Sequence, residues 1–136
     1  MANLSQTAAN VAIGSSGTRI RVGQAGESIT QGQPVYLSSN KYYRCDANVQ
    51  AKARADGIAL TPAATDGYFI LQEGVGGFVN LGATLTIGET YVVSATVGAI
   101  APIGDLTSGD YPSILGVATT TALLQTVYAH TGVAKP

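Results

Sequence analysis

The chain has 136 residues, of which 46% are hydrophobic and only 11% charged, and its formal net charge at pH 7 is −1. This length suits a single domain. No run of like charges could follow a phosphate backbone or an anionic membrane, and no segment is long and apolar enough to span a bilayer. Neither nucleic acid nor a membrane is therefore an expected partner.

The low charge itself indicates assembly. An average soluble domain has about 25% charged residues, and interface cores are depleted in charge. We therefore expect much of the surface to be covered in the working state. The alternative is a monomer whose surface is kept soluble by Thr, Ser and Gln side chains.

Residues 1–17 are small and polar and end in a Gly/Ser-rich stretch. They predict an extended N-terminal arm that a neighbouring molecule would order, and a disordered tail is the alternative. No basic stretch is followed by an apolar segment here, so we expect a protein made in the cytoplasm without a secretory signal.

The first predicted strand runs from Thr18 to Val22. Ile20 and Val22 lie on one side of it, and Arg19 and Arg21 lie on the other. This alternation predicts a half-buried strand.

The next strands are separated by turn residues. Pro34 has no N–H group and should begin the strand that reaches Leu37. A turn at 38–41 predicts a hairpin with the strand Tyr42–Asp46. Three more strands are expected at 58–60, 68–72 and 78–81, and residues 47–54 predict only a weak helical turn.

A sequence repeat divides the remaining chain. Four positions of one segment match four positions of a later segment without a gap. Gly26, Ile29, Thr30 and Gly32 correspond to Gly82, Leu85, Thr86 and Gly88. Two later blocks match in the same order, so we expect two related β units at about 26–72 and 82–125. The prediction is all-β, a small antiparallel β-barrel or β-sandwich in a single domain at 18–136.

Candidates for chemistry are few. His130 has no second His or Cys nearby, so we expect a surface or strand-end histidine, and Cys45 should be a small packing residue. The carboxylates at Asp46, Asp56, Asp66, Asp105 and Asp110 stand in turn-forming sequences. We therefore expect no enzyme, no metal site and no cofactor.

The glycine-rich stretch 74–77 does not have the pattern of a phosphate-binding site. It lacks the Lys-Ser/Thr pair that follows a phosphate-binding loop. A bulge or tight turn is the expectation.

One string of residues carries a resemblance to a family. Gly32-Gln33-Pro34-Val35-Tyr36-Leu37, a short Tyr/Arg strand and then Ala55-Asp56-Gly57-Ile58-Ala59-Leu60 resemble the capsid cement, or head decoration, proteins of tailed bacteriophages. The likeness covers about residues 18–130. It implies a small β protein, made in the host cytoplasm, that binds the major capsid protein on the outer surface of the virion shell, often as a homotrimer. It brings no catalytic residues.

From this resemblance and the arm we expect the partner contacts to come from the N-terminal region. The expected partner-binding residues are Asn3, Leu4, Ser5, Gln6, Asn10, Val11, Ile13, Arg19 and Arg21.

Two other functions remain open from the sequence. A tail or head-fibre module could bind host-surface carbohydrate or a receptor through exposed tyrosine rings; the candidates are Tyr36, Tyr42, Tyr43, Tyr91 and Tyr111. A hydrolase could assemble a site from Asp residues and His130.

Overall fold

The computed structural model describes residues 3–14 and 18–136. These residues form two antiparallel sheets and no closed barrel, which confirms the all-β prediction. The six-stranded sheet has the order β1-β7-β11-β10-β8-β9, and the five-stranded sheet has the order β2-β6-β5-β3-β4.

The strands of the six-stranded sheet are β1 (Val11–Ile13), β7 (Phe78–Leu81), β8 (Thr90–Val93), β9 (Ile100–Pro102), β10 (Ser113–Ala118) and β11 (Leu123–His130). Those of the five-stranded sheet are β2 (Ile20–Gln24), β3 (Pro34–Ser38), β4 (Lys41–Arg44), β5 (Gly57–Ala59) and β6 (Tyr68–Gln72). Three short 3-10 turns are η1 (Ala8–Asn10), η2 (Gln50–Lys52) and η3 (Ile103–Asp105). The turn η2 lies within the weak helical turn expected at 47–54.

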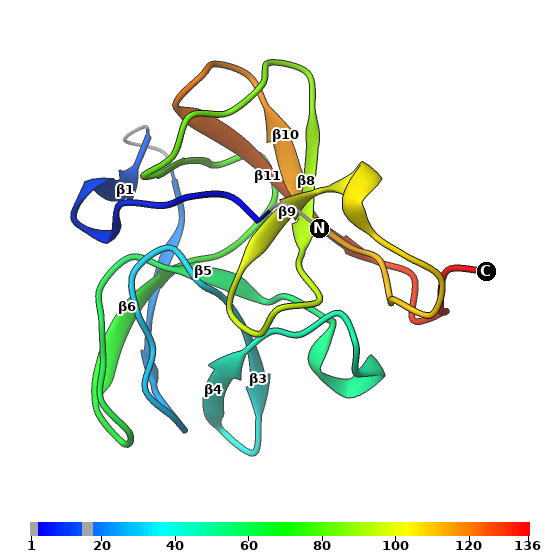
Figure 1. The fold of residues 1–136 in the computed structure, drawn as a ribbon. Coiled ribbons are helices and arrows are strands. Elements are labelled where there is room, and N and C mark those ends of the chain that lie inside the picture. Colours follow the sequence, from blue (N-terminus) through cyan, green and yellow to red (C-terminus); the bar gives the residue numbers. More distant parts are fainter. Residues whose placement is uncertain (1–2, 15–17) are drawn as a thin grey trace.

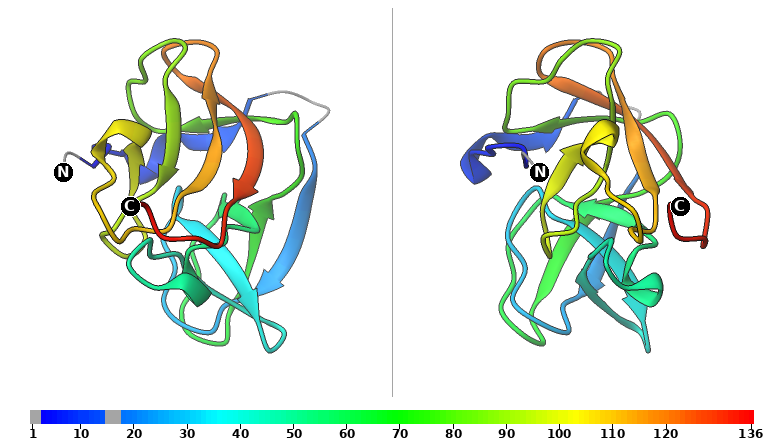
Figure 2. Two further views of the ribbon diagram at one scale, coloured as in Figure 1. Left: turned by 90° about the vertical axis from the view of Figure 1, so that its right-hand side faces the viewer. Right: turned by 45° about the vertical axis from the view of Figure 1, so that its right-hand side comes forward.

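The two sheets occupy opposite halves of the molecule. In Figure 1 most of the six-stranded sheet lies above and the five-stranded sheet below, and the views in Figure 2 agree. Counted from β2 and from β7, the five consecutive strands of each half have the same spatial order.

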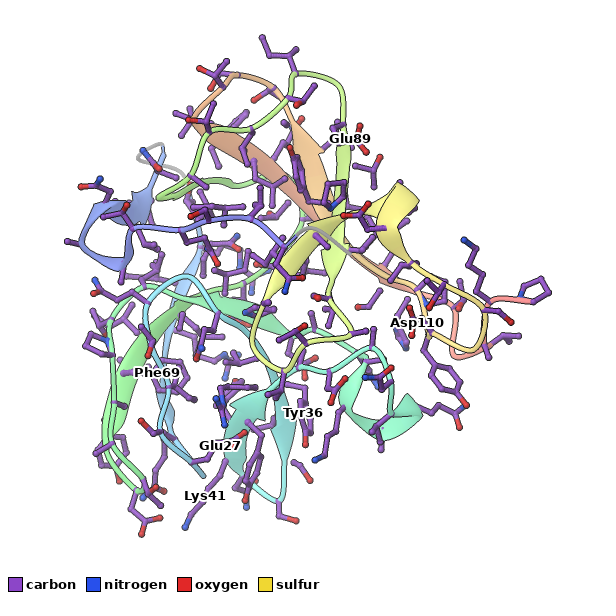
Figure 3. The ribbon with its side chains drawn as sticks, viewed as in Figure 1. Glu27, Tyr36, Lys41, Phe69, Glu89 and Asp110 are labelled. Atoms are coloured by element: carbon purple, nitrogen blue, oxygen red, sulfur yellow. The ribbon has the colours of Figure 1, made fainter. Side chains whose placement is uncertain are left out.

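Apolar side chains form two cores. The larger core contains residues of both halves, among them Ile58 of β5 and Leu124 of β11, each with no exposed surface. The smaller core lies inside the five-stranded sheet and includes Phe69, Leu71 and Tyr42. Phe69 is labelled in Figure 3 beside β6.

The five-stranded sheet is strongly curled, so that its two edge strands approach each other at one end. Ala25, just after β2, forms an isolated parallel bridge with Tyr42 of β4, and the N–H of Gly26 donates to the Tyr42 carbonyl at 2.8 Å. Gly23 has no side chain where the Tyr42 ring packs: a Cβ there would lie 2.6 Å from a ring carbon.

The predicted hairpin is confirmed. Pro34 is the first residue of β3, and Ser38 pairs with Lys41 across a two-residue turn. Ser39 and Asn40 both have positive φ, 52° and 67°, as expected for the primed turn that matches the twist of a hairpin.

The first strand departs from its prediction. Ile20 and Val22 are 54% and 67% exposed, and Arg21 is exposed as well, so β2 is not half-buried. The reason is position: β2 is an edge strand, and its apolar side chains lie on the outer face of the curled sheet. The alternation of arginine and apolar residues separates the two faces of β2, but it does not show which face another element covers.

Candidate interaction surface

The N-terminal segment lies along the six-stranded sheet. We call the described residues 3–14 the strap. The N–H of Leu4 donates to the carbonyl of Ile100 in β9 at 2.8 Å, and the N–H of Thr7 donates to Gly82 at 2.6 Å. β1 then pairs with β7, Val11 opposite Leu81. The prediction of an extended arm ordered by a neighbour is therefore not confirmed for these residues; Met1, Ala2, Ser15, Ser16 and Gly17 of the predicted arm lie outside the described residues.

The Gln6 side chain fixes the strap to both halves of the body. Its amide Nε2 donates to the carbonyls of Gly32, before β3, at 3.1 Å and of Leu81, in β7, at 3.0 Å. A Cβ at Gly32, whose φ is +87°, would lie 2.6 Å from this nitrogen. The close approach explains why a glycine suits this position.

Replacing Gln6 by Ala should therefore loosen the strap. Two partly buried carbonyls would lose their donor, which is expected to lower the free energy of unfolding by about 1–2 kcal/mol. Ser5→Ala is the control, because the Ser5 side chain is exposed on the same segment. Urea unfolding of the two variants measures the difference, and equal midpoints would contradict this role of Gln6.

The strap alternates between inward and outward side chains. Leu4 packs against the larger core, and Val11 is only 5% exposed. Outward-facing positions include Asn3, Ser5 and Asn10, while Ile13 is 43% exposed.

Of the nine predicted contact residues, seven lie on the strap. Leu4, Gln6 and Val11 face the body, and their contact with a partner stays a prediction. Arg19 and Arg21 are not part of the strap, because the chain has by then entered the five-stranded sheet.

A polar hollow of about 590 Å³ opens beside the outward face of the strap. It is lined by Ser5, Thr7, Asn10, Asn80, Gly82, Ala83, Thr84, Thr121 and Ala122. None of these side chains is charged. Hydroxyl and amide groups of this kind offer hydrogen bonds to another protein surface without the cost of desolvating a charge.

Sequence reasoning missed the body's contribution to this hollow. The residues at 80–84 come from the end of β7 and the loop after it, and those at 121–122 come from the loop before β11, far from the strap in sequence. Their proximity depends on the pairing of β1 with β7. The Val-Ala-Ile stretch of β1 is too short to show a strand pattern.

A buried polar network joins β6 to β11. Gln72 and Thr126 have no exposed surface, and the Tyr128 hydroxyl donates to the Gln72 side-chain oxygen. Thr126 in turn donates to the Gly74 carbonyl at 2.7 Å. Burial raises the pKa of Tyr128 well above its ordinary value, so this phenol stays protonated at neutral pH and acts as a donor within the core.

Three titratable residues discussed in the sequence analysis lie in a core, at a strand end and in a turn, respectively. Cys45 is fully buried, and burial raises the pKa of its thiol well above the ordinary value. His130 is exposed as the last residue of β11. Asp110 accepts the Thr107 N–H at 2.9 Å, as expected of a turn carboxylate. Within 3–14 and 18–136, no group of three or more His, Cys, Asp or Glu side chains is placed to hold a metal ion.

Two of the tyrosines that are candidates for carbohydrate binding lie in contact with each other. The rings of Tyr36 and Tyr43 have centroids 5.8 Å apart with 31° between their planes. Tyr36, labelled in Figure 3 on β3, also lines a shallow hollow with Arg54 and Asp56. By contrast, Tyr42 and Tyr91 are buried, at 6% and 2% exposure, and could not offer a ring face.

No helix in the described part of the chain has the length and apolarity needed to cross a bilayer. Comparison with protein-family models, with curated protein sequences and with solved structures finds no match for this chain.

Proposed function

We propose that the protein decorates the outer surface of a phage capsid, where it binds the major capsid protein and stabilises the shell as a homotrimer. The observation that carries the proposal is the strap surface: outward polar side chains border an uncharged hollow of about 590 Å³. The low charge of the whole chain and the resemblance of residues 18–130 to decoration proteins support it.

The strap supplies contacts in a form suited to a repeated lattice. Because its inward residues bind the body, its outward residues are held in place before docking. This preorganisation lowers the entropy lost on binding. Many modest contacts repeated over a shell then add up through avidity.

Charge placed in the hollow tests the proposal. Ser5→Arg and Asn10→Arg should each lower the affinity for capsids by about tenfold or more, because burying an unpaired charge at the contact is unfavourable and keeping it hydrated forces the surfaces apart. Ser38→Arg, an exposed change in the five-stranded sheet, is the matched control. Occupancy is read by electron microscopy of stripped shells to which each folded variant is added back. Equal occupancy for all three variants would rule out this surface.

The second candidate is a fibre module that binds carbohydrate, favoured by the Tyr36–Tyr43 pair. Sugars stack on tyrosine faces with their polar groups directed to nearby acceptors. A glycan array separates the two functions. Binding that Tyr43→Ala removes would favour the fibre module, and copy numbers in the hundreds per particle would favour decoration.

We also infer that the body consists of two related units, at about 26–72 and 82–125, preceded by the strap. The identical strand order of β2–β6 and β7–β11 supports this. The aligned residues Ile29 and Leu85 are both 2% exposed, and their N–H groups both donate to the loop before the last strand of their unit, each at 2.8 Å.

Matching glycines give the same support. The N–H of Gly32 donates to the Ala59 carbonyl at 2.7 Å, and the N–H of Gly88 donates to the Ala118 carbonyl at 2.8 Å. Both glycines have positive φ, 87° and 84°. Equivalent contacts at aligned positions are the expected result of a duplicated β unit that shares one core.

A further inference from the structure

The edge of β2 differs from its counterpart in the other sheet. In the six-stranded sheet, β7 has β11 on one side and β1 of the strap on the other. In the five-stranded sheet, β2 occupies the corresponding place, and within residues 3–14 and 18–136 it pairs only with β6. The first part of β2 therefore has an open edge where β7 has a strand.

The open edge carries backbone groups ready to pair. On the β6 side, the Arg19 carbonyl accepts the Glu73 N–H at 3.1 Å and the Ala25 N–H donates to Gly67 at 2.8 Å. Alternate residues of an antiparallel strand direct these groups to opposite sides. The N–H and C=O groups of Ile20 and Val22 are thus directed away from β6.

A hollow of about 300 Å³ lies beside this edge, between β2 and the β3–β4 hairpin. It is lined by Arg21, Val22, Gly23, Gln24, Leu37, Asn40, Tyr42 and Tyr68. Three of the lining side chains are large, apolar and exposed: Val22 at 67%, Leu37 at 49% and Tyr68 at 71%. The hollow can receive the side chains of an added strand.

The side chains of β2 specify the chemistry of such a strand. Ile20 and Val22 lie on the outer face, and Arg19 and Arg21 lie on the other face beside Glu73. Arg21 pairs with Glu73 at 2.8 Å, whereas no ion pair among the described residues involves Arg19, which leaves this cluster with a net positive charge. Directly opposite residues of paired strands share a face. The complement of Arg-Ile-Arg-Val is therefore a strand that alternates acidic and apolar residues.

We infer that the β2 edge is a binding site for an extended, alternately acidic and apolar segment of a partner protein, which adds a strand to the five-stranded sheet. Main-chain hydrogen bonds to Ile20 and Val22 supply affinity, and carboxylates opposite Arg19 and Arg21 supply selectivity. A second copy of this chain fits less well, because none of its edge strands β1, β2, β4 and β9 contains an acidic residue. Arginines that only guard an edge against pairing would not explain the adjacent exposed apolar side chains. The site is separate from the strap and does not depend on the proposed decoration function.

Peptide binding to the full chain tests this inference. The probe is acetyl-Val-Glu-Val-Glu-Val-Glu-Val-amide, and the matched probe has Lys in place of Glu. Titrated into 15N-labelled protein, the acidic peptide should shift the Ile20 and Val22 amide signals saturably and slow their hydrogen exchange, and the Lys peptide should bind about tenfold more weakly. The acidic peptide can also be N-methylated on the backbone amides of one edge. When that edge faces β2, the methyl groups should remove the exchange protection of the Ile20 and Val22 amides.

Variants at Arg19 complete the test. Because this side chain is exposed, its substitution should leave the protein folded. Arg19→Lys should keep the preference for the acidic peptide, and Arg19→Glu should reduce or reverse it. Equal binding of both peptides, or no shift at β2, would overturn the inference. Protection of Ile20 and Val22 that grows with protein concentration in the absence of peptide would overturn the choice of partner and identify a second copy as the occupant.

Discussion

A chain that lacks residues 2–14 is expected to unfold at a clearly lower denaturant concentration than the full chain, and to lose its binding to shells. The loss of shell binding follows from the proposed function. The loss of stability follows from the contacts of the strap, and it would not be expected of an arm that depends on a neighbour for its order.

The expected loss is at least about 3 kcal/mol. Burial of Val11 contributes about 2 kcal/mol, and the partly buried Leu4 contributes about 1 kcal/mol. The deletion also leaves Gly32 and Leu81 without the Gln6 donor and opens the β7 edge. Against a typical total stability of about 5–15 kcal/mol, the truncated body should still fold.

A peptide with the sequence of residues 1–14 provides the control. Added in excess to the truncated body, it should raise the unfolding midpoint, because it binds only the folded state. The same peptide with Val11→Asp should not, since a carboxylate would replace a side chain that is 5% exposed. A truncated body as stable as the full chain would show that the strap contributes no net stability.

The parts of the fold that could be predicted are those with local causes. Pro34 marks the start of a strand because it lacks an N–H, and the residues at 38–41 predict a hairpin because Asn readily adopts positive φ. Cys45 and Asp110 likewise have the packing and turn roles that their neighbours in sequence indicate.

The parts that could not be predicted depend on contacts far apart in sequence. Whether Ile20 and Val22 are buried depends on which element covers their face of β2, and no element of the described part of the chain does. The strap surface depends on β1 meeting β7, about 70 residues away in sequence, for which three residues carry no periodic signal. Tyr128 has a φ of 51° and lies beside the register shift between β10 and β11. That shift depends on how the two strands pair, which the local sequence does not specify.

Gly116→Ala is the single substitution expected to destabilise the body most. Gly116 lies in β10 between β8 and β11, next to the register shift. A Cβ at this position would lie 2.1 Å from the carbonyl oxygen of Gln125 and 2.9 Å from its carbon. Both atoms belong to the backbone, so β11 itself must move away, and its hydrogen bonds with β10 weaken as it does.

The expected loss is about 3 kcal/mol or more, measured as the free energy of unfolding in urea. Gly57→Ala should also destabilise the body, but less, because a Cβ on Gly57 would lie 2.4 Å from the Gln72 carbonyl oxygen, compared with 2.1 Å from the Gln125 carbonyl oxygen for Gly116. Gly104→Ala is the matched control: its Cβ would meet nothing within 4 Å and its φ is not in the left-handed region. If Gly116→Ala accumulates only as insoluble protein, the milder loss of Gly57→Ala relative to Gly104→Ala still measures the effect. Wild-type stability in both strand variants would contradict the close approach of the strands at these two glycines.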